Sequence, residues 1–312
     1  MKRAGPAKRT VQEVRVGKHE LSLSNLDKVL YPQTGFTKAD AIDYYARVAP
    51  ALLPHLKDRP LTLKRYPDGV EAPYFYQKEC PPHPKWVATT AVWSDTNDRN
   101  VNYCMANSLE TLVWLVNAGD LEMHAFLAKR GDIQRPTMVA FDLDPGDGAG
   151  ILDCAQVAAW LKKDLDGLGL QGFPKVSGSK GLQIYVPLNT KVTYEGPKGT
   201  KPFSRALAER MEREHPDLVV SNMRKELRRS KVLVDWSQNT ESKTTVCVYS
   251  LRARDTPWVS APVTWRELAA ALGKDDPERL FFSPEDALRR VDRLGDLFAP
   301  VLTLKQRLPA HA

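Results

Sequence analysis

Apolar residues recur at helical spacing in some segments of the chain and form short continuous runs in others. The helical spacing predicts helices that begin after Thr37 and that cover 107–117, 151–168 and about 202–214. Asp40 follows Thr37 by three positions, which is the spacing of a capping box at a helix start. The charged stretch from 264 onward is also expected to be helical.

Short apolar runs bounded by glycine or proline predict strands. These runs cover 138–148, 182–188 and 231–236, and an extended segment is expected over 246–254. A β-hairpin is expected over 60–78, with its turn at 67–69. Strands and helices alternate irregularly, which favours an α+β (mixed α/β) domain whose loops carry the chemistry.

The chain contains no internal repeat and no low-complexity linker that would divide it. We expect a basic flexible N-terminus over 1–15, a single catalytic domain over 16–300 and a C-terminal tail over 301–312. A chain of 312 residues buries enough surface to fold without a metal or a disulfide. Its four cysteines form no C-x-x-C pair, so we expect neither a structural zinc site nor a disulfide framework.

Composition narrows the class of protein. The hydrophobic fraction is 42% and the charged fraction 27%, values of an ordinary globular protein that exclude disorder, collagen and coiled coil. There are 45 Lys and Arg against 38 Asp and Glu, and the net charge of +7 weakly favours polyanionic partners. The basic N-terminus lacks the apolar stretch of a signal peptide, and no apolar run is long enough to span a membrane. We therefore expect no membrane partner and a reducing, cytoplasmic location.

Three aspartates at predicted strand ends are candidates for metal ligands. Asp142 and Asp144 are two positions apart in a strand, so they share a face, while Phe141 and Leu143 face the core. Two adjacent carboxylates repel unless a cation or a proton lies between them, and a divalent metal is a natural partner. The alternative is a solvated strand end before a Pro-Gly turn. Asp235 ends a third apolar run, and three such aspartates can hold two ions for phosphoryl or nucleotidyl transfer, although spacing alone does not bring Asp235 to the other two.

Two basic segments are candidates for phosphate contacts. Residues 177–181, Ser-Gly-Ser-Lys-Gly, could direct backbone N–H groups at an anion, with Lys180 adding charge. They lack the spacing of a Walker A loop, and an ordinary hairpin turn is the alternative. Residues 224–231 contain five basic residues and one acid. A solvated charge run is the usual explanation, but the position before Asp235 makes Arg228 a candidate for contact with a triphosphate.

The predicted hairpin over 60–78 carries Lys64 and Arg65 and the aromatic run 74–76. Cations and aromatics on one hairpin could hold phosphate and stack on a base. Exposed aromatics on a hairpin more often pack against a helix, and this alternative stays open.

Lys28 and Lys38 flank the segment Tyr-Pro-Gln-Thr-Gly-Phe-Thr. Lys38 lies in the first turn of a predicted helix, whose N-terminus itself favours phosphate. His124 lies in the apolar segment Leu-Glu-Met-His-Ala-Phe, and from the sequence pattern alone we expect it to be a core histidine.

Taken together, four motifs resemble the polymerase domain of bacterial DNA ligase D. They are FDLDPG at 141–146, SGSKGL at 177–182, VDWSQN at 234–239 followed by SKTT, and NLDKVLYP at 25–32 followed by TK. That domain belongs to the archaeo-eukaryotic primase superfamily and serves non-homologous end joining. The resemblance runs in order from about residue 20 to about residue 290. It implies a primase-polymerase fold, with a central, largely antiparallel sheet that carries the catalytic aspartates and is flanked by helices.

The resemblance also assigns roles to residues. Asp142, Asp144 and Asp235 would be the catalytic residues and the ligands of two ions, Mn²⁺ or Mg²⁺. The residues near the NTP or dNTP substrate would be Ser177, Lys180, Gly181, Arg228, His124, Lys64, Phe75, Tyr76, Gln238, Arg252 and Arg254. The pocket for the 5′-phosphate of a recessed DNA end would be formed by Asn25, Lys28 and Lys38. For His124, the resemblance replaces the expectation of a core histidine.

Two segments depart from the family pattern. Gln183 stands where the family usually has a histidine after S-G-S-K-G-L. Glutamine can donate a hydrogen bond but cannot carry a charge, so triphosphate affinity or its pH dependence is expected to differ. Residues 88–103 differ from the family loop associated with bringing two DNA ends together, which makes end-bridging less certain than polymerisation.

The function implied by the resemblance is metal-dependent, template-directed extension of DNA 3′ ends, with release of pyrophosphate and a preference for ribonucleotides. The expected substrates are DNA ends, gapped or primer–template DNA and nucleoside triphosphates, with Ku and a DNA ligase as possible partners at the bacterial nucleoid. No ligase or nuclease domain follows in the sequence, so we expect a stand-alone relative or an excised piece. The alternatives are a primase that makes primers de novo and a non-catalytic module that binds DNA ends.

Overall fold

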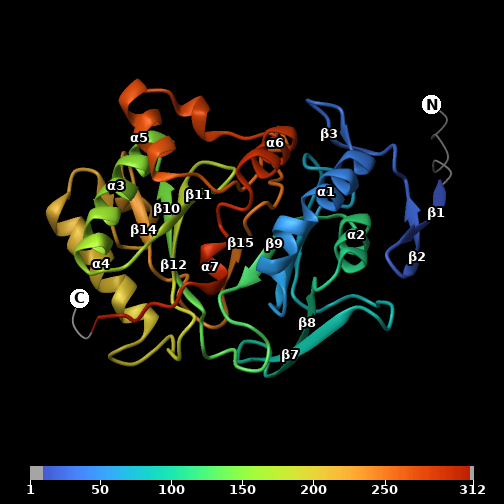
Figure 1. Ribbon diagram of the computed structural model, residues 1–312, viewed down its shortest axis with the longest axis horizontal. Coiled ribbons are helices and arrows are strands. Elements are labelled where there is room, and N and C mark those ends of the chain that lie inside the picture. The colour runs from blue at the N-terminus through green and yellow to red at the C-terminus, as the bar shows by residue number, and fades with distance from the viewer. Residues whose placement is uncertain (1–9, 310–312) are drawn as a thin grey trace.

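The computed structural model of the chain describes residues 10–309 (Figure 1). The α-helices in this range are α1 (Lys38–Leu56), α2 (Leu109–Asn117), α3 (Ile151–Gly167), α4 (Thr200–Glu214), α5 (Trp265–Lys274), α6 (Pro284–Leu294) and α7 (Pro300–Thr303), and short 3₁₀ helices cover Lys225–Leu227 and Pro277–Leu280.

The strands form two main sheets. The five-stranded sheet has, in spatial order, β11 (Phe173–Val176), β12 (Leu182–Pro187), β10 (Met138–Pro145), β14 (Val232–Asp235) and β13 (Val219–Val220), and only β13 and β14 are parallel. The six-stranded sheet has β15 (Thr244–Val246), β9 (Asp120–Phe126), β5 (Leu61–Arg65), β8 (Arg99–Met105) and β7 (Ala88–Ser94), with β6 (Phe75–Gln77) paired to β5. Two small hairpins are β1 (Val11–Val16) with β2 (His19–Ser24), and β3 (Val29–Tyr31) with β4 (Phe36–Thr37).

This arrangement confirms the predicted α+β fold with largely antiparallel sheets and flanking helices. Figure 1 shows α3, α4 and α5 beside the five-stranded sheet and α1 and α2 beside the six-stranded sheet. The sequence led us to expect one central sheet, and the structure adds a second. The three aspartates all belong to the five-stranded sheet, because Asp142 and Asp144 lie on β10 and Asp235 ends β14.

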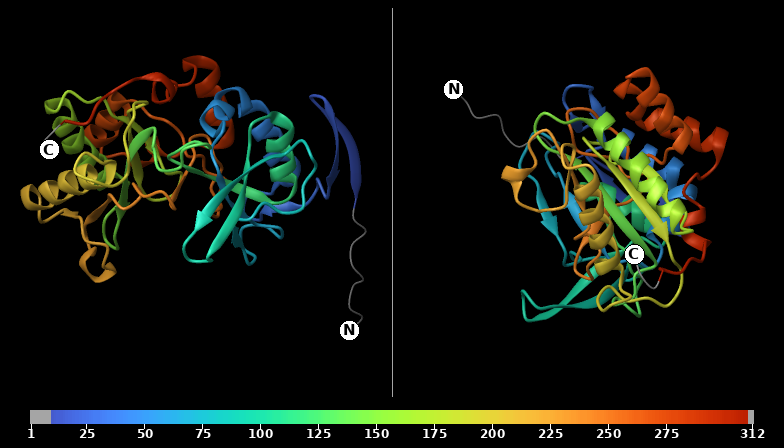
Figure 2. Two further views of the ribbon diagram at one scale, coloured as in Figure 1. Left: turned by 90° about the horizontal axis from the view of Figure 1, so that it is seen from below. Right: turned by 90° about the vertical axis from the view of Figure 1, so that its left-hand side faces the viewer.

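Local signals in the sequence explain where several elements begin. At α1, the hydroxyl oxygen of Thr37 accepts a hydrogen bond from the Asp40 amide, and the Asp40 carboxylate accepts one from the Thr37 amide. This capping box confirms the predicted start. The predicted hairpin over 60–78 is formed by β5 and β6, and Figure 2 shows a second hairpin, β7 with β8, projecting from the body of the molecule.

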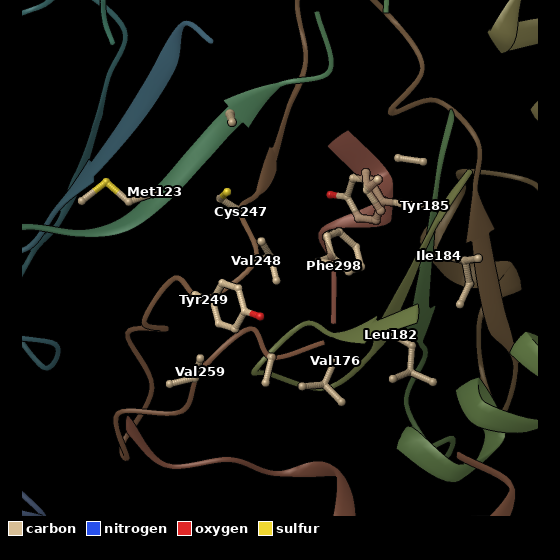
Figure 3. Packing of buried hydrophobic residues seen from close by; sticks show 14 of the residues in the cluster. Met123, Val176, Leu182, Ile184, Tyr185, Cys247, Val248, Tyr249, Val259 and Phe298 are labelled. Carbon is tan, nitrogen blue, oxygen red and sulfur yellow. The ribbon is translucent and has the colours of Figure 1, made fainter. Parts of the chain in front are cut away.

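The hydrophobic core continues between the two sheets. Helices α3 and α4 pack on β10 from one side. On the other side, Figure 3 shows Cys247, Val248 and Tyr249 between Met123 of β9 and Leu182 of β12. The extended segment expected over 246–254 is a strand only at its start, because Tyr249 has a φ of +65° and the chain turns there.

The domain boundaries stay a prediction, but parts of the two expected end segments have regular structure. Residues 11–15 belong to strand β1 and pair with β2 rather than forming a flexible segment. Near the C-terminus, α7 and the following residues pack on the body, with the Gln306 amide donating to the Leu188 carbonyl. The parts of these predictions that concern 1–9 and 310–312 lie outside the described residues.

The expectation that no disulfide forms was wrong. Cys80, before β7, is bonded to Cys104 of β8, and their Cα atoms are 4.9 Å apart. Cys154 and Cys247 are free and buried. Cys80 and Cys104 are 24 positions apart, so only the pairing of the segment before β7 with β8 reveals their proximity. None of the helices between residues 10 and 309 is both long enough and apolar enough to cross a membrane.

Candidate active site

A row of polar side chains crosses four strands of the five-stranded sheet. Asp142 of β10 lies opposite Asp235 of β14 on one side and opposite Gln183 of β12 on the other, and Gln183 lies opposite Lys175 of β11. Directly opposite residues have Cβ atoms about 4.5–5.5 Å apart, so the sheet register brings Asp235 to Asp142. Asp144 lies two positions further along the same face of β10.

The three aspartates repel one another in a partly buried setting. Removal from water raises the pKa of Asp142 to about 8, and the negative charges of Asp144 and Asp235 raise it as well. Removal from water and the Asp235 charge likewise raise the pKa of Asp144. The charge of Lys175 acts in the opposite direction on Asp142, as do those of Arg228 and Arg252 on Asp144, but both pKa values stay raised. The row therefore has the electrostatics of a cation-binding site.

Carboxylate oxygens are the donors that Mg²⁺ and Mn²⁺ prefer, and the donor set therefore fits a divalent ion. The residues that the structure describes nevertheless include no group of three His, Cys, Asp or Glu side chains already arranged around an ion position. Asp235 accepts hydrogen bonds from the Ser237 amide at 2.7 Å and from Gln238 Nε2 at 2.8 Å. These two donors would compete with an ion for the Asp235 carboxylate.

Asp142 and Asp144 open into a pocket of about 940 Å³ between the two sheets. The other predicted residues that line it are Ser177, Lys180, Arg228, His124, Tyr76, Gln238, Arg252 and Arg254. Sequence reasoning missed further lining residues, among them Thr62 and Lys78. Lys225 and Lys243 also line the pocket, and they lie in the quoted segments 224–231 and SKTT without having been assigned a role. The predicted residues that do not line it are Asp235, Gly181, Lys64 and Phe75.

The loop 177–181 is both a hairpin turn and a wall of the pocket, so the two interpretations of its sequence are compatible. It joins the antiparallel strands β11 and β12, and the Ser177 hydroxyl accepts hydrogen bonds from the amides of Ser179 and Gly181. A Cβ atom at Gly181 would lie 2.1 Å from the Leu143 carbonyl oxygen. Gly181 is therefore needed for the close approach of the loop to β10, while Lys180 supplies the charge.

Two arginines fasten this loop to the opposite side of the pocket. Arg252 Nη1 donates to the Ser177 carbonyl, and Arg254 Nη2 donates to the Ser179 hydroxyl. Arg228 comes from the basic run 224–231 and donates to the Met223 carbonyl. The pocket thus has cationic side chains around the carboxylates, as a triphosphate with bound metal requires.

A buried glutamate that sequence reasoning missed connects the basic groups of the six-stranded sheet. Glu122 of β9 is 1% exposed and accepts hydrogen bonds from Lys64 Nζ at 3.2 Å and His124 Nε2 at 2.8 Å. It also lies 3.3 Å from Arg252 Nε and accepts from the Ala253 amide at 3.1 Å. The alternation of Glu122 and His124 along one strand was the available signal, because it puts both on the same face.

These contacts decide the charge of Glu122. Burial alone would raise the pKa of this carboxyl, but the hydrogen bond from His124 and the charges of Arg252 and Lys64 hold it well below its usual range. Burial lowers the pKa of His124 in spite of the Glu122 contact. Since His124 lines the pocket, the expectation of a core histidine was wrong.

The aromatic residues of the β5/β6 hairpin are exposed rather than packed against a helix. Tyr74, Phe75 and Tyr76 have exposed fractions of 51%, 45% and 58%. Lys64 Nζ lies 4.5 Å from the centre of the Tyr74 ring and 5.6 Å from that of Tyr76. Because these rings are exposed, they are available to stack on a base at the rim of the pocket.

Comparison with known proteins identifies the family. The family described as "LigD, primase-polymerase domain" matches residues 37–298. The chain belongs to this family. It is 42% identical over 288 residues to the multifunctional non-homologous end joining protein LigD of Mycobacterium bovis, and the match covers 89% of this chain and 36% of that protein. For the LigD protein of Mycolicibacterium smegmatis the identity is 39% over 282 residues, with the same two coverages.

A solved structure from the same family has the same fold as this chain. The polymerase domain of Mycobacterium tuberculosis ligase D, determined in complex with DNA, superposes with a TM-score of 0.82 at 40% identity and covers 92% of this chain and 99% of that one. The chain spans about a third of the length of these mycobacterial LigD relatives. From the family match and the structural match together, the chain is a nucleotidyltransferase of the primase-polymerase type.

The LigD-type residues expected at a DNA 5′-phosphate lie together but outside the pocket. The Lys28 amide donates to the Asn25 carbonyl, and the Lys38 amide donates to the Lys28 carbonyl. Lys28 Nζ forms an ion pair with Asp68 at 2.6 Å. Lys38 is buried, and its Nζ donates to the Ser24 carbonyl at 2.6 Å.

Gln183, where this chain departs from the LigD pattern, is buried beside its cross-strand neighbour Lys175. Gln183 is 4% exposed and Lys175 is fully buried. Lys175 Nζ donates to the Ser260 hydroxyl at 2.6 Å, and burial lowers the pKa of this lysine to about 7, although Cys247 and Asp142 act in the other direction. Sequence reasoning did not identify Lys175, because one lysine in a short apolar strand is not distinctive.

Proposed function

We propose that the chain is a metal-dependent, template-directed nucleotidyltransferase that extends DNA 3′ ends and releases pyrophosphate. The observation that carries this proposal is the register of β10 and β14, which puts Asp235 opposite Asp142 beside a pocket rimmed by basic side chains. A site built only to bind DNA gains nothing from carboxylates that repel phosphate. The geometry thus favours catalysis over a non-catalytic DNA-end-binding module.

Asp142, Asp144 and Asp235 would hold two divalent ions, Mn²⁺ or Mg²⁺. When bound, the ions supply charge neutralisation at the triphosphate and acidity at the attacking 3′-hydroxyl. The role of the protein is to hold the carboxylates on rigid strands. Ser237 and Gln238 would give up their hydrogen bonds to Asp235 when the ions bind. The 3′-hydroxyl attacks the α-phosphate, the bond to the β-phosphate breaks, and pyrophosphate leaves.

The remaining predicted residues divide into two groups. The triphosphate would lie against Ser177, Lys180, Arg228, Arg252 and Arg254, with Gly181 shaping the loop and Gln238 beside Asp235. The nucleoside would lie toward His124 and Tyr76, with Lys64 and Phe75 just behind the rim. We extend the proposal to a preference for ribonucleotides, which rests on the family resemblance.

The DNA side of the proposal concerns the ends of broken or gapped duplexes. Asn25, Lys28 and Lys38 would bind the 5′-phosphate of a recessed end, which requires Lys28 to exchange Asp68 for phosphate. The relatives are named as non-homologous end joining proteins, and on that basis we propose a role in end joining at the nucleoid, with Ku and a DNA ligase as partners.

Incorporation assays test this function directly. Gapped, overhanging and primer-free DNA would each be offered rNTPs or dNTPs with Mn²⁺ or Mg²⁺, for the native chain and for Asp142→Ala. We expect extension on gapped and overhanging DNA, higher with rNTPs, and none by the variant. Dinucleotides on primer-free template would instead favour a primase, and undiminished extension by a folded Asp142→Ala variant would overturn the role of the aspartates.

The 5′-phosphate pocket needs its own test. Lys28→Ala should weaken binding to 5′-phosphorylated recessed ends and leave binding to unphosphorylated ends unchanged. Equal losses on both kinds of end would refute a dedicated pocket.

A further inference from the structure

A second basic groove lies at the end of β10 and β12 that is remote from the aspartates. Its volume is about 870 Å³, and it is lined by residues 129, 135–137, 188–192, 198, 305, 307 and 308. Met138 pairs with Pro187 at this end, and Leu143 pairs with Leu182 at the other. At about 3.3 Å per residue, the two ends are about 17 Å apart. Figure 1 shows the chain after α7 running past this end of the sheet.

Six exposed cationic side chains line the groove, and none of its lining residues is acidic. They are Lys129, Arg135, Lys191, Lys198, Lys305 and Arg307. Among the residues that the structure describes, Asp132 at 3.1 Å from Arg135 is the only carboxylate in an ion pair with any of the six. The charge of the groove is therefore largely uncompensated.

The C-terminal segment 305–308 forms one wall of the groove, and hydrogen bonds hold this segment against the body of the molecule. Gln306 donates from its amide to the Leu188 carbonyl and from Nε2 to the Pro187 carbonyl. Its own carbonyl accepts from the Thr190 hydroxyl. Lys305 and Arg307 flank Gln306 and are exposed, while Gln306 is partly buried, so the extended chain directs both cations to the same side.

Another groove of similar size also contains several arginines, but most of them are paired with carboxylates. The groove beside α6 has a volume of about 740 Å³, and its lining contains Arg279, Arg289, Arg290 and Arg293 together with Glu278, Asp286 and Asp292. Three of its arginines are paired: Arg279 with Asp276, Arg289 with Asp286, and Arg290 with Glu267. The two grooves have similar volumes and opposite degrees of compensation.

We propose that the uncompensated groove binds the phosphate backbone of duplex DNA outside the active site. Lys and Arg contacts to phosphate position a duplex without reading its sequence, and the groove has no aromatic lining residue on which unpaired bases could stack. The inference goes beyond nucleotide transfer, and it rests on the proposed function only in taking DNA as the polyanion. Its site shares no residue with the catalytic pocket.

The test compares Lys191→Ala/Lys305→Ala/Arg307→Ala with Arg279→Ala/Arg289→Ala/Arg293→Ala, which removes the same three charges from the compensated groove. Affinity for a long, blunt, unphosphorylated duplex would be measured by fluorescence anisotropy over a range of salt concentrations, without nucleotide or metal. Each lost phosphate contact lowers the slope of log K against log salt by about 0.9. We therefore expect a slope that is shallower by about 2 to 3 for the first variant and unchanged for the second.

Two results would overturn the inference: a native slope in the first variant, or equal losses in both variants, since the latter would mean that only net charge matters. A native slope combined with binding of acidic peptides would assign the groove to a protein partner. Circular dichroism spectra would confirm folding. Because the binding assay contains no nucleotide, failure of the proposed polymerase activity leaves this result interpretable, and at saturating DNA the first variant should retain the native incorporation rate.

Discussion

Two carboxylate regions lie on the two sheets that flank the pocket, and their electrostatics are opposite. On the five-stranded sheet, Asp142 has like-charged neighbours and a pKa raised to about 8. On the six-stranded sheet, Glu122 is surrounded by Lys64, His124 and Arg252, and its pKa is well below the usual range. The electrostatics of the first region favour a bound cation, whereas the carboxylate of the second is already paired with basic groups of the protein. Burial alone therefore does not decide what a carboxylate does, since its neighbours decide.

The largest effect should come from removing one of the repelling charges. Asp142→Asn should abolish incorporation, because a metal ion contributes several kcal/mol in the transition state, on the order of 10³-fold or more in rate. In the presence of a chelator the variant should be at least as stable as the native chain, since a repulsion is relieved. Thermal unfolding with and without Mn²⁺ measures this: Mn²⁺ should raise the Tm of the native chain only. An equal Mn²⁺ shift in both proteins would place the metal elsewhere.

Removal of the charge of Glu122 should have the opposite effect on stability. Glu122→Gln leaves buried basic groups without a counter-charge, and breaking a buried pair costs about 3–5 kcal/mol. The KM for nucleotide should also rise, because His124 and Arg252 lose their common anchor. Chemical denaturation and steady-state kinetics check both effects.

Glu267→Gln is the matched control for that variant. Glu267 pairs with Arg290 at 2.5 Å, and it does not line the catalytic pocket. We expect a loss of stability without a change in KM. A Glu122→Gln protein with native KM would show that Glu122 serves stability alone.

The stability difference between the native chain and Glu122→Gln should depend on pH. Because folding lowers the pKa of Glu122, the ionised carboxylate stabilises the folded chain above the unfolded-state pKa of about 4.3, and this contribution is lost as the pH falls toward the folded pKa. The difference should be full at neutral pH and shrink below about pH 4. Urea unfolding at several pH values measures it, and a difference that grows in acid would contradict the assignment.

A smaller effect is expected when a titratable group is added to the aspartate row. Gln183 lies opposite Asp142, so Gln183→His places a cation beside the carboxylates below about pH 6.5. This makes the aspartate region more similar to that of Glu122. We expect the KM for nucleotide to change by tenfold or less, which is on the order of the effect of one charge interaction. Its pH dependence between 6 and 8 should differ from that of the native chain, in which Asp142 and Lys175 already titrate near this range. Superimposable pH profiles would show that position 183 does not act on the triphosphate.

The smallest effect concerns a third buried carboxylate. Asp120 is fully buried, and neither of its oxygens accepts a hydrogen bond of good geometry from the described residues, although the Lys64 amide and the Arg65 charge act to lower its pKa. Burial raises its pKa well above the usual value, so its contribution to stability is lost as the pH rises from the unfolded-state pKa of about 3.9 through the folded one. Asp120→Asn should therefore raise the free energy of unfolding at neutral pH by about 1 kcal/mol and by less in acid. A loss of stability at neutral pH would mean that Asp120 is ionised and paired with Arg65.

Local patterns in the sequence predicted much of the fold and part of the site. Alternation along β10 placed Asp142 and Asp144 on one face, and Thr37 with Asp40 located the start of α1. These signals lie within a few residues of each other, so backbone geometry alone connects them.

The parts that could not be predicted depend on contacts between distant segments. The pairing of β10 with β14, which brings Asp235 to Asp142, is set by packing of whole strands. The same holds for Glu122, whose partners come from β5, β9 and the segment after β15, and for the bond between Cys80 and Cys104. The family resemblance supplied the aspartates but not Glu122 or Lys175. Lys175 lies outside the quoted motifs, and Glu122 was quoted only as a neighbour of His124.

Arg252 connects the two halves of the pocket. Its guanidinium contacts Glu122 of the six-stranded sheet and the Ser177 carbonyl of the loop on the five-stranded sheet, and its backbone carbonyl accepts a hydrogen bond from the Tyr31 hydroxyl. One side chain thus acts as a strut between the two walls. Any hinge motion that separated the two sheets at the pocket would have to break these contacts, so this one arginine sets how far the two walls stand apart.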